Sequence, residues 1–399
     1  MNKKTLPYII GTCLFAILAN SIMYLDDVPL LRVFFSLLRL CAVGVALFLS
    51  VQNRNLGGKN IRWLMLFFIL LGSITIIKHG AINMVISYLI NSFGITLLIY
   101  NAIKESPRMA ARVLANVFAT FIYLNFATLL IAPDGIFHGS YLLGRNYNQI
   151  GMVLVCGMAT YIAAYNMHVK SFASTLLLCA VASVSPLITG SMTSAVGCLL
   201  TIVFLFFPKK RQKKIILIFL FAFYILFQIL VIFLQSDISG AHIITYIIEN
   251  VMGKDLTFTD RARVWLIALD MIQDSPLIGY GIRDGDWFET YFGVLSAHNI
   301  IFQILIYGGT ILFGYFIVMI FGSVRHALKE TTTLTYTLLL GLCTTFIMMM
   351  MENYNLVLIL YLLCITYYSN MLSKSVHQRR AAAREHDTTI QPCKLPNTQ

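Results

Sequence analysis

One histidine in residues 260–309 lies where a catalytic base could lie. His298 comes where a polar loop meets an apolar run, and Ser296 could cap the helix that follows. Such a cap would put His298 in the first helical turn, where the positive end of the helix disfavours an imidazolium ion. A neutral imidazole accepts a proton, as a general base must. The alternative is a polar residue that caps a membrane helix, because a lone histidine is weak evidence of catalysis.

Arginines in the same stretch could bind an anion. Arg261, Arg263 and Arg283 belong to a long loop on the less basic side of the chain, so their charges need a partner. Guanidinium groups pair with phosphate through two hydrogen bonds, which makes a phosphate or diphosphate a suitable ligand. The alternative is a set of solvated charges beside the neighbouring aspartates. Arg145 is a fourth candidate from a separate loop, with Asn148 close to it in sequence.

Acidic residues near these arginines allow two further interpretations. Asp284 and Asp286 form a D-x-D triplet, which holds a divalent metal in many glycosyltransferases. Matches of three residues are common by chance, and glycine between two aspartates is ordinary turn chemistry, so we expect no metal site. Glu352 stands at the outer end of a predicted span. It is either an end residue or a partner for one of the arginines, and we favour the partner.

The composition is that of a membrane protein. The 399 residues are 58% hydrophobic and 12% charged, with a mean hydropathy of +0.79. A soluble protein cannot hide so much apolar surface, and repeated apolar runs of about 20 residues match the thickness of a bilayer. The net charge of +12 follows from basic loops on the cytoplasmic side, and we expect no nucleic-acid partner. No cysteine pair has metal-site spacing, so we expect neither a metal site nor a disulfide framework.

The fold expected is all-α, with twelve transmembrane helices in one polytopic domain, residues 1–372. The loops alternate between two sides of the membrane, and Lys and Arg are about three times as frequent on one side as on the other. The more basic side is normally cytoplasmic, and both termini belong to it. Residues 373–399 form a basic tail that we expect to be disordered. The predicted spans are 6–24, 33–51, 62–77, 80–100, 112–132, 148–166, 171–189, 193–207, 215–235, 299–321, 333–351 and 354–372.

The large outer loop, residues 236–298, has its own predicted structure. A helix is expected over residues 260–274, with Thr257 and Asp260 suited to a capping box at its start. The Ser275–Pro276 pair ends this helix. Gly279–Gly281 then predicts a turn with unusual backbone angles.

These motifs together resemble the O-antigen ligase and O-antigen polymerase-like superfamily of bacterial membrane enzymes. The resemblance rests on Arg263 with Trp265 just after it, on the SPLIGYG run of residues 275–281, and on the HN element that opens residues 298–309. Weaker elements are GRNYNQIG at 144–151 and TGSMTSA at 189–195. In the second of these, members often have arginine after the serine, whereas this chain has Met192.

The resemblance implies a metal-independent glycosyltransferase that works without a cofactor on the outer face of the bacterial cytoplasmic membrane. Members take a glycan from a polyprenyl diphosphate and join it to a sugar hydroxyl of a second glycan or of a lipid A core. A flippase and a chain-length regulator are further expected partners. We predict that His298 and Arg263 are catalytic and favour a polymerase over a ligase; the alternative is a twelve-span transporter or lipid-linked oligosaccharide flippase. The predicted substrate-binding residues are Arg145, Asn148, Arg261, Arg283, Asn299 and Glu352.

Overall fold

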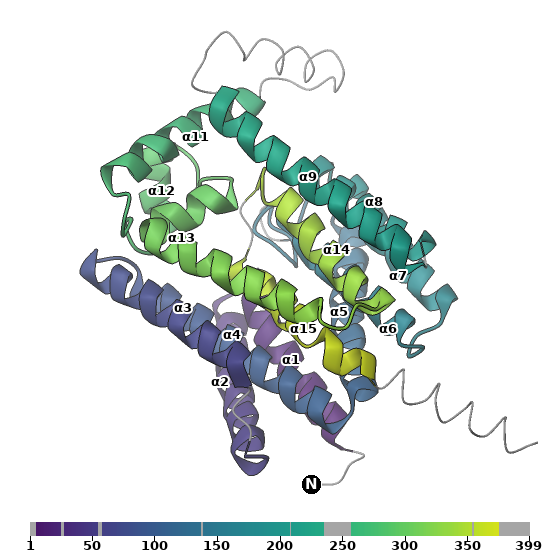
Figure 1. Cartoon of the computed structure of the whole chain (residues 1–399). Helices are drawn as coiled ribbons and strands as arrows, with labels where there is room; N and C mark the ends of the chain where they lie inside the picture. The colour runs from purple at the N-terminus through teal and green to yellow at the C-terminus, as the bar shows by residue number, and fades with distance from the viewer. Residues whose placement is uncertain are drawn as a thin grey trace, which may run out of the picture.

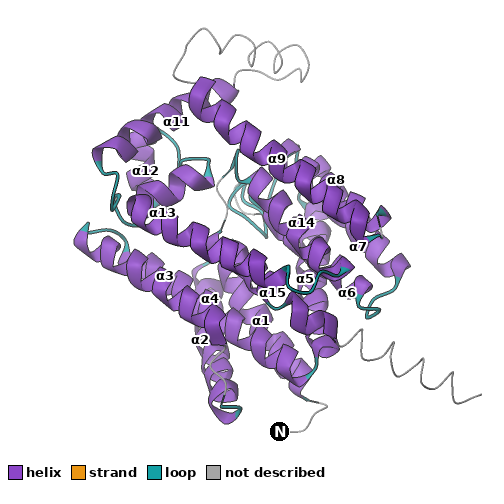
Figure 2. Ribbon diagram, viewed as in Figure 1, coloured by secondary structure: helices purple, strands orange, loops and turns teal. Residues whose placement is uncertain are grey.

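The described part of the chain consists of helices joined by loops and turns. The computed structural model describes residues 5–24, 28–54, 58–136, 139–207, 209–234, 257–352 and 355–374. Within these ranges the helices form one bundle, and β-pairing is limited to an isolated bridge between Tyr141 and Gly144 (Figures 1 and 2). The all-α prediction is therefore confirmed for the described residues.

Every predicted span corresponds to a helix. Six of these helices, α2–α5, α9 and α13, are long and apolar enough to cross a bilayer, and the other six are shorter apolar helices. The chain is a polytopic membrane protein. The twelve helices are α1 Leu6–Ile22, α2 Pro29–Gln52, α3 Gly58–Ile77, α4 Ile82–Glu105, α5 Pro107–Ile131, α6 Ile150–Asn166, α7 Phe172–Ile188, α8 Met192–Phe206, α9 Lys210–Leu234, α13 Ile300–Ala327, α14 Thr333–Met348 and α15 Leu356–Tyr367.

The centre of the bundle is formed by α6, α14 and α15, whose residues are almost all buried. Small residues let these helices approach closely, as in other membrane bundles. A side chain at Gly341 would overlap Ala159, and one at Gly157 would overlap Ile122 and crowd Phe118. By contrast, α2 and α9 are mostly exposed, so they form the lipid-facing periphery.

The loops predicted to face outward gather at one end of the bundle, which we call the Glu352 end. There the Tyr24 amide donates to the Leu142 carbonyl at 3.1 Å, and Arg283 donates to the Lys78 carbonyl at 2.7 Å. Segments that are far apart in the sequence therefore meet on the side that the charge distribution assigns to them.

The loops predicted to be cytoplasmic meet at the opposite end, which we call the Lys374 end. Asn53 donates to the side chain of Asn101 at 3.1 Å, and Lys374 lies 3.5 Å from Glu330. The alternation of the predicted loops between two ends of the bundle is thus reproduced by the contacts of the described residues.

The large outer loop begins outside the described residues, which resume at residue 257. Its predicted helix is observed as α11 Thr257–Asp274 and ends before Ser275, as expected. The proposed capping box of Thr257 and Asp260 rests on side chains outside the described set. A second, short helix, α12 Gly285–Phe292, follows (Figure 1). The tail prediction lies outside the described residues beyond Lys374.

The loop after α11 is joined to a break in α13. Gly308–Gly309 leaves helical geometry, with φ of 58° at the second glycine. The backbone groups freed by the break bond to the loop: Tyr280 donates to the Ile306 carbonyl at 2.7 Å, and Thr310 donates to the Pro276 carbonyl at 2.8 Å. Because a bilayer offers no water to unpaired backbone groups, such a break needs these partners. This docking explains why the SPLIGYG run and the glycine pair occur together.

Replacing Gly309 with alanine is expected to lower stability by about 2 kcal/mol or more. Its φ of 58° is unfavourable for alanine, and a Cβ there would overlap the backbone of Leu277. The matched control is Gly314→Ala on the same helix, because a Cβ at Gly314 meets nothing within 4 Å. The measurement is the thermal midpoint of the purified protein in detergent. Equal midpoints for the two variants would contradict the docking of the loop on α13.

Candidate active site

Glu352 is the centre of a polar cluster at the Glu352 end. The residue is 3% exposed, and its Oε1 lies 3.1 Å from Nδ1 of His298. Its Oε2 lies 3.5 Å from a terminal nitrogen of Arg261 and accepts a hydrogen bond from Asn148 Nδ2 at 3.2 Å. A buried carboxylate without partners is costly, so these three groups stabilise the charge of Glu352.

Four separate segments deliver this cluster. Arg261 is in the first turns of α11, and His298 precedes α13. Asn148 lies in the loop before α6, and Glu352 follows α14. The cluster therefore depends on the tertiary fold, because two of its members are 204 residues apart.

The Asn148 side chain is aimed at Glu352 by two buried serines. Its Oδ1 lies 2.8 Å from the Ser191 hydroxyl, and Ser194 donates to its main-chain carbonyl at 3.1 Å. Ser191 is also the N-cap of α8, where it accepts a bond from the Ser194 amide. The amide oxygen is thus occupied, which leaves Nδ2 to face the carboxylate. The serines belong to the TGSMTSA element, which was noted in the sequence without a role for either one.

His298 stands before the helix rather than in its first turn. The cap of α13 is Asn299, whose side chain accepts from the Ile301 amide at 2.9 Å, so the prediction that Ser296 caps this helix is wrong. His298 itself has φ of 49°, a region that histidine enters less often than asparagine or glycine. Residues held in such geometry cluster at functional sites.

The Nδ1 edge of the His298 ring lies beside Glu352, and the side chain is 21% exposed. Nδ1 is buried at ion-pair distance from the carboxylate, without the alignment of a hydrogen bond. A carboxylate beside Nδ1 favours a proton on that nitrogen, which leaves Nε2 as the acceptor. The positive helix end that was expected to keep the ring neutral is therefore not the neighbour of His298, whose charged neighbour is instead the carboxylate of Glu352.

Asn299 and its neighbours anchor this segment. The Asn299 side chain is fully buried and donates to Gln228 of α9 at 3.1 Å. Gln303 accepts a bond from the Ala297 amide at 3.0 Å. Both polar groups of Asn299 are used inside the protein, which gives this predicted substrate-binding residue a positioning role in the structure. Gln228 had no signal in the sequence, since it is an isolated polar residue in an apolar run.

The other predicted arginines lie outside the contacts of the cluster. Arg263 is exposed and donates to the Phe292 carbonyl at 3.4 Å. Arg283 donates to the carbonyls of Tyr280 and Lys78, at 3.0 and 2.7 Å, and stacks over Trp287. It therefore ties the outer loop to the α3–α4 turn.

Arg145 is exposed, and its described contact is through its backbone amide, which donates to Gln149 at 2.9 Å. Met192 of the TGSMTSA element is the first residue of α8 and is 53% exposed.

The D-x-D triplet has a structural role at its first position. Asp284 is the N-cap of α12 and accepts from the Trp287 amide at 3.0 Å. Among the described residues, no group of three or more His, Cys, Asp or Glu side chains is arranged to hold a metal ion.

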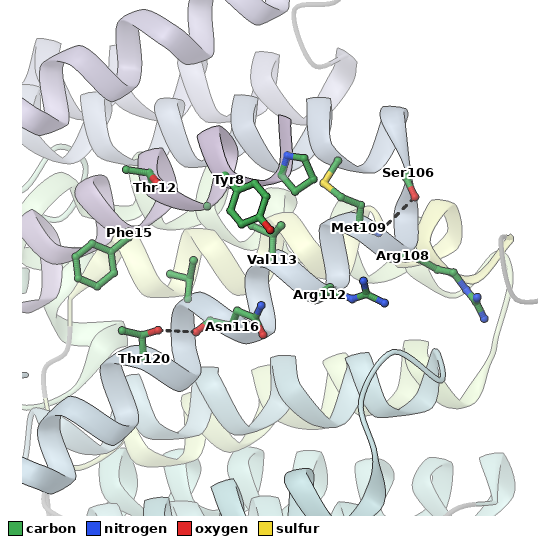
Figure 3. Close-up of a pocket in the computed structure, with 13 residues that line it drawn as sticks. Tyr8, Thr12, Phe15, Ser106, Arg108, Met109, Arg112, Val113, Asn116 and Thr120 are labelled. Atoms are coloured by element: carbon green, nitrogen blue, oxygen red, sulfur yellow. Dashed lines mark hydrogen bonds between the residues drawn. The ribbon is translucent and has the colours of Figure 1, made fainter. Parts of the chain in front are cut away.

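A cavity of about 920 Å³ lies at the Lys374 end, away from this cluster (Figure 3). It runs between α1 and α5, with Tyr8 and Phe15 on one side and Arg112 and Asn116 on the other. None of the predicted site residues lines it. The cavity is therefore separate from the candidate active site.

Part of the chain matches a known protein family. Residues 175–317 match the O-antigen ligase family. The match spans α7 to the middle of α13, so it includes Arg261 and His298 but neither Asn148 nor Glu352. None of the curated proteins matches the chain. The resemblance inferred from the sequence is confirmed over the matched residues.

Proposed function

We propose that the protein transfers a glycan from a polyprenyl diphosphate to an acceptor sugar hydroxyl, and that the cluster around Glu352 is its active site. One observation carries the proposal: Glu352 contacts both His298 and Arg261, so an imidazole and a guanidinium group flank one buried carboxylate. The O-antigen ligase match supports this class of reaction. Lipid-linked glycan substrates also explain why the site lies at a membrane end of the bundle.

Arginine provides the stabilisation that this reaction needs. A diphosphate is a good leaving group, so the main requirement is to stabilise the negative charge that builds on it. Arg261 is the best-supported candidate because its guanidinium lies in the cluster, 3.5 Å from Glu352. Arg263, two residues further along α11, is proposed as a second phosphate contact. Arg145 on the facing loop is proposed to bind the donor at a greater distance from the reacting bond.

His298 is proposed as the general base. Its Nε2 takes the proton of the acceptor hydroxyl while the hydroxyl oxygen attacks the anomeric carbon of the donor. The bond between that carbon and the diphosphate breaks, and its electron pair leaves with the diphosphate. The imidazolium that forms is stabilised by Glu352, as a carboxylate stabilises histidine in a catalytic triad. This direct displacement needs no metal ion and inverts the anomeric configuration.

The topology that accompanies this mechanism has twelve spans and both termini in the cytoplasm. The Glu352 end then faces outward, where the glycan is presented, while the polyprenyl tail stays in the bilayer. The less basic character of the loops at this end supports that orientation. We favour a repeat-unit polymerase over a ligase, with a flippase supplying the donor and a chain-length regulator as a further partner.

The proposal is tested with purified protein and a polyprenyl-diphosphate glycan, with and without a lipid A core acceptor. A polymerase lengthens the lipid-linked glycan without a core acceptor, and a ligase yields product only with it. Product of inverted configuration, formed at the same rate in a chelator, is the expected result. Absence of any transfer with either acceptor would refute the proposed reaction.

Replacing Glu352 with glutamine is expected to lower the transfer rate by about 10- to 100-fold. The shape is kept, but the imidazolium formed at His298 loses its stabilising charge, and Arg261 loses its ion pair. The matched control is Glu330→Gln, which removes the ion pair with Lys374 at the other end of the bundle. Initial rates of transfer are compared at equal protein levels. Equal rates for the two variants would remove Glu352 from the mechanism.

A further inference from the structure

A charged side chain lies deep in α2, outside the site described above. Arg39 is ten residues after the start of α2, or about 15 Å along the helix axis. Within the described residues it has no acidic side chain at ion-pair distance. Charged groups inside a membrane segment are costly and usually serve a function, so Arg39 needs an explanation.

Arg39 lines a cavity of about 340 Å³ between α1, α2 and α4. Asn20, Ser36 and Ser87 contribute polar groups from these three helices. Arg32, one further arginine on α2, lines the same cavity. The described lining includes the guanidinium group of Arg39 and no acidic side chain.

The hydrogen bonds of Arg39 are incomplete. One terminal nitrogen donates to Asn20 Oδ1 and to Ser87 Oγ, both at 2.8 Å. Nε is buried and has no partner, and the second terminal nitrogen donates to no described residue. A second bond, from Asn20 Nδ2 to the Ser36 hydroxyl at 3.2 Å, keeps the amide oxygen turned to the guanidinium. The arginine is therefore held in place, with donors to spare for a ligand that has several acceptor oxygens.

The cavity lies near the Glu352 end of the bundle. The carbonyl of Ser21 accepts a hydrogen bond from Asn355, three residues after Glu352. Tyr24, which lines the cavity, donates its amide to Leu142 in the loop that carries Asn148. Because α2 is mostly exposed, the cavity is next to the surface that lipids cover.

We propose that the Arg39 cavity binds the phosphate group of a membrane lipid at the Glu352 end. A phosphate supplies the acceptor oxygens that the free guanidinium donors require, and its charge offsets that of Arg39. The acyl or polyprenyl chain lies along the exposed face of α2. The cavity adds a second phosphate-binding position to that proposed at Arg261, and it does not depend on the transfer reaction.

Lipid binding is measured by native mass spectrometry of the purified protein in neutral detergent. The probes are phosphatidylglycerol, glycan-free polyprenyl diphosphate and, as a lipid without phosphate, diacylglycerol. All variants are made in an Arg261→Ala background, which removes the phosphate contact proposed for the active site. Arg39→Gln is expected to lower phosphate-lipid affinity by about tenfold or more. Arg39→Lys retains part of the affinity, and Arg325→Ala at the Lys374 end is the control.

The variant Ser36→Leu is a second, independent test, because the larger side chain fills the cavity while the Arg39 guanidinium is kept. Loss of binding in both Arg39→Gln and Ser36→Leu supports the site. If the variants lose the same affinity for both phosphate lipids, the Arg39 cavity binds bulk phospholipid. If they lose more affinity for polyprenyl diphosphate, the cavity binds the substrate lipid. Unchanged affinity in both variants, or equal binding of diacylglycerol, would overturn the proposal. An inactive wild-type protein in the transfer assay would refute the proposed function and leave this binding result intact.

Discussion

Replacing His298 with asparagine is expected to lower glycan transfer by about 10²- to 10⁴-fold, the range for loss of a general base. Asparagine accepts positive φ more readily than most residues, so the backbone at φ 49° is kept while the base is lost. The carboxamide can still approach Glu352, which keeps the local packing. The rate is measured with saturating acceptor and a polyprenyl-diphosphate glycan, at protein levels matched to the wild type.

The chain offers a close control for this variant. His168 also has positive φ, 56°, and is exposed at the Lys374 end. The variant His168→Asn makes the same chemical change in the same backbone conformation, away from the cluster. We expect it to retain the wild-type rate. A similar loss in both variants, or none in His298→Asn, would contradict the role of His298 as base.

Replacing Arg261 with alanine is expected to lower the transfer rate by about 10²- to 10³-fold, as for other groups that stabilise a developing anion. The loss arises because the departing diphosphate no longer meets the cation beside Glu352. Arg261→Lys is expected to recover only part of the rate, since an ammonium group lacks the paired donors of guanidinium. Arg325→Ala, at the far end of α13, is the control.

The same assay ranks the other arginines. Arg283→Ala is expected to act mainly on stability, because its guanidinium is already bonded to the carbonyls of Lys78 and Tyr280. The sequence analysis predicted Arg263 to be the catalytic arginine, whereas the geometry of the cluster favours Arg261. A larger rate loss in Arg263→Ala than in Arg261→Ala would reverse this assignment and restore the first interpretation.

The fold was largely predictable because a bilayer leaves few choices. Each long apolar run must be a helix, and the basic loops indicate which segments share a side, as the contacts at the two ends reproduce. The break of α13 at Gly308–Gly309 was not predicted. Periodicity continues through the break, and its stability comes from backbone bonds to Tyr280 and Pro276 that no local pattern reveals.

The site was predictable only in part. His298, Glu352 and the arginines stood out because polar residues are rare in this chain, and Glu352 was expected to be a partner of one of the arginines. Which arginine it meets depends on how α11 lies over the bundle, and spacing alone does not determine that. The roles of Ser191 and Gln228 were missed, because each acts by holding another side chain.

The transporter alternative predicts a different position for the substrate-binding site. A transporter holds its substrate near the middle of the membrane, between two related halves. Among the described residues, the polar cluster instead lies at one end, with contributions from loops after α5, α7, α9 and α14. Arg39 lies ten residues into α2, and its cavity is also near the Glu352 end.

The most direct test of the account is an experimental structure of the protein with a bound polyprenyl-diphosphate glycan. We predict that the diphosphate lies within hydrogen-bond distance of Arg261, with Nε2 of His298 directed at the space beside the anomeric carbon and the lipid tail in the bilayer. A diphosphate bound at the Lys374 end, or a glycan enclosed at mid-bundle away from His298, would contradict the proposed transfer site.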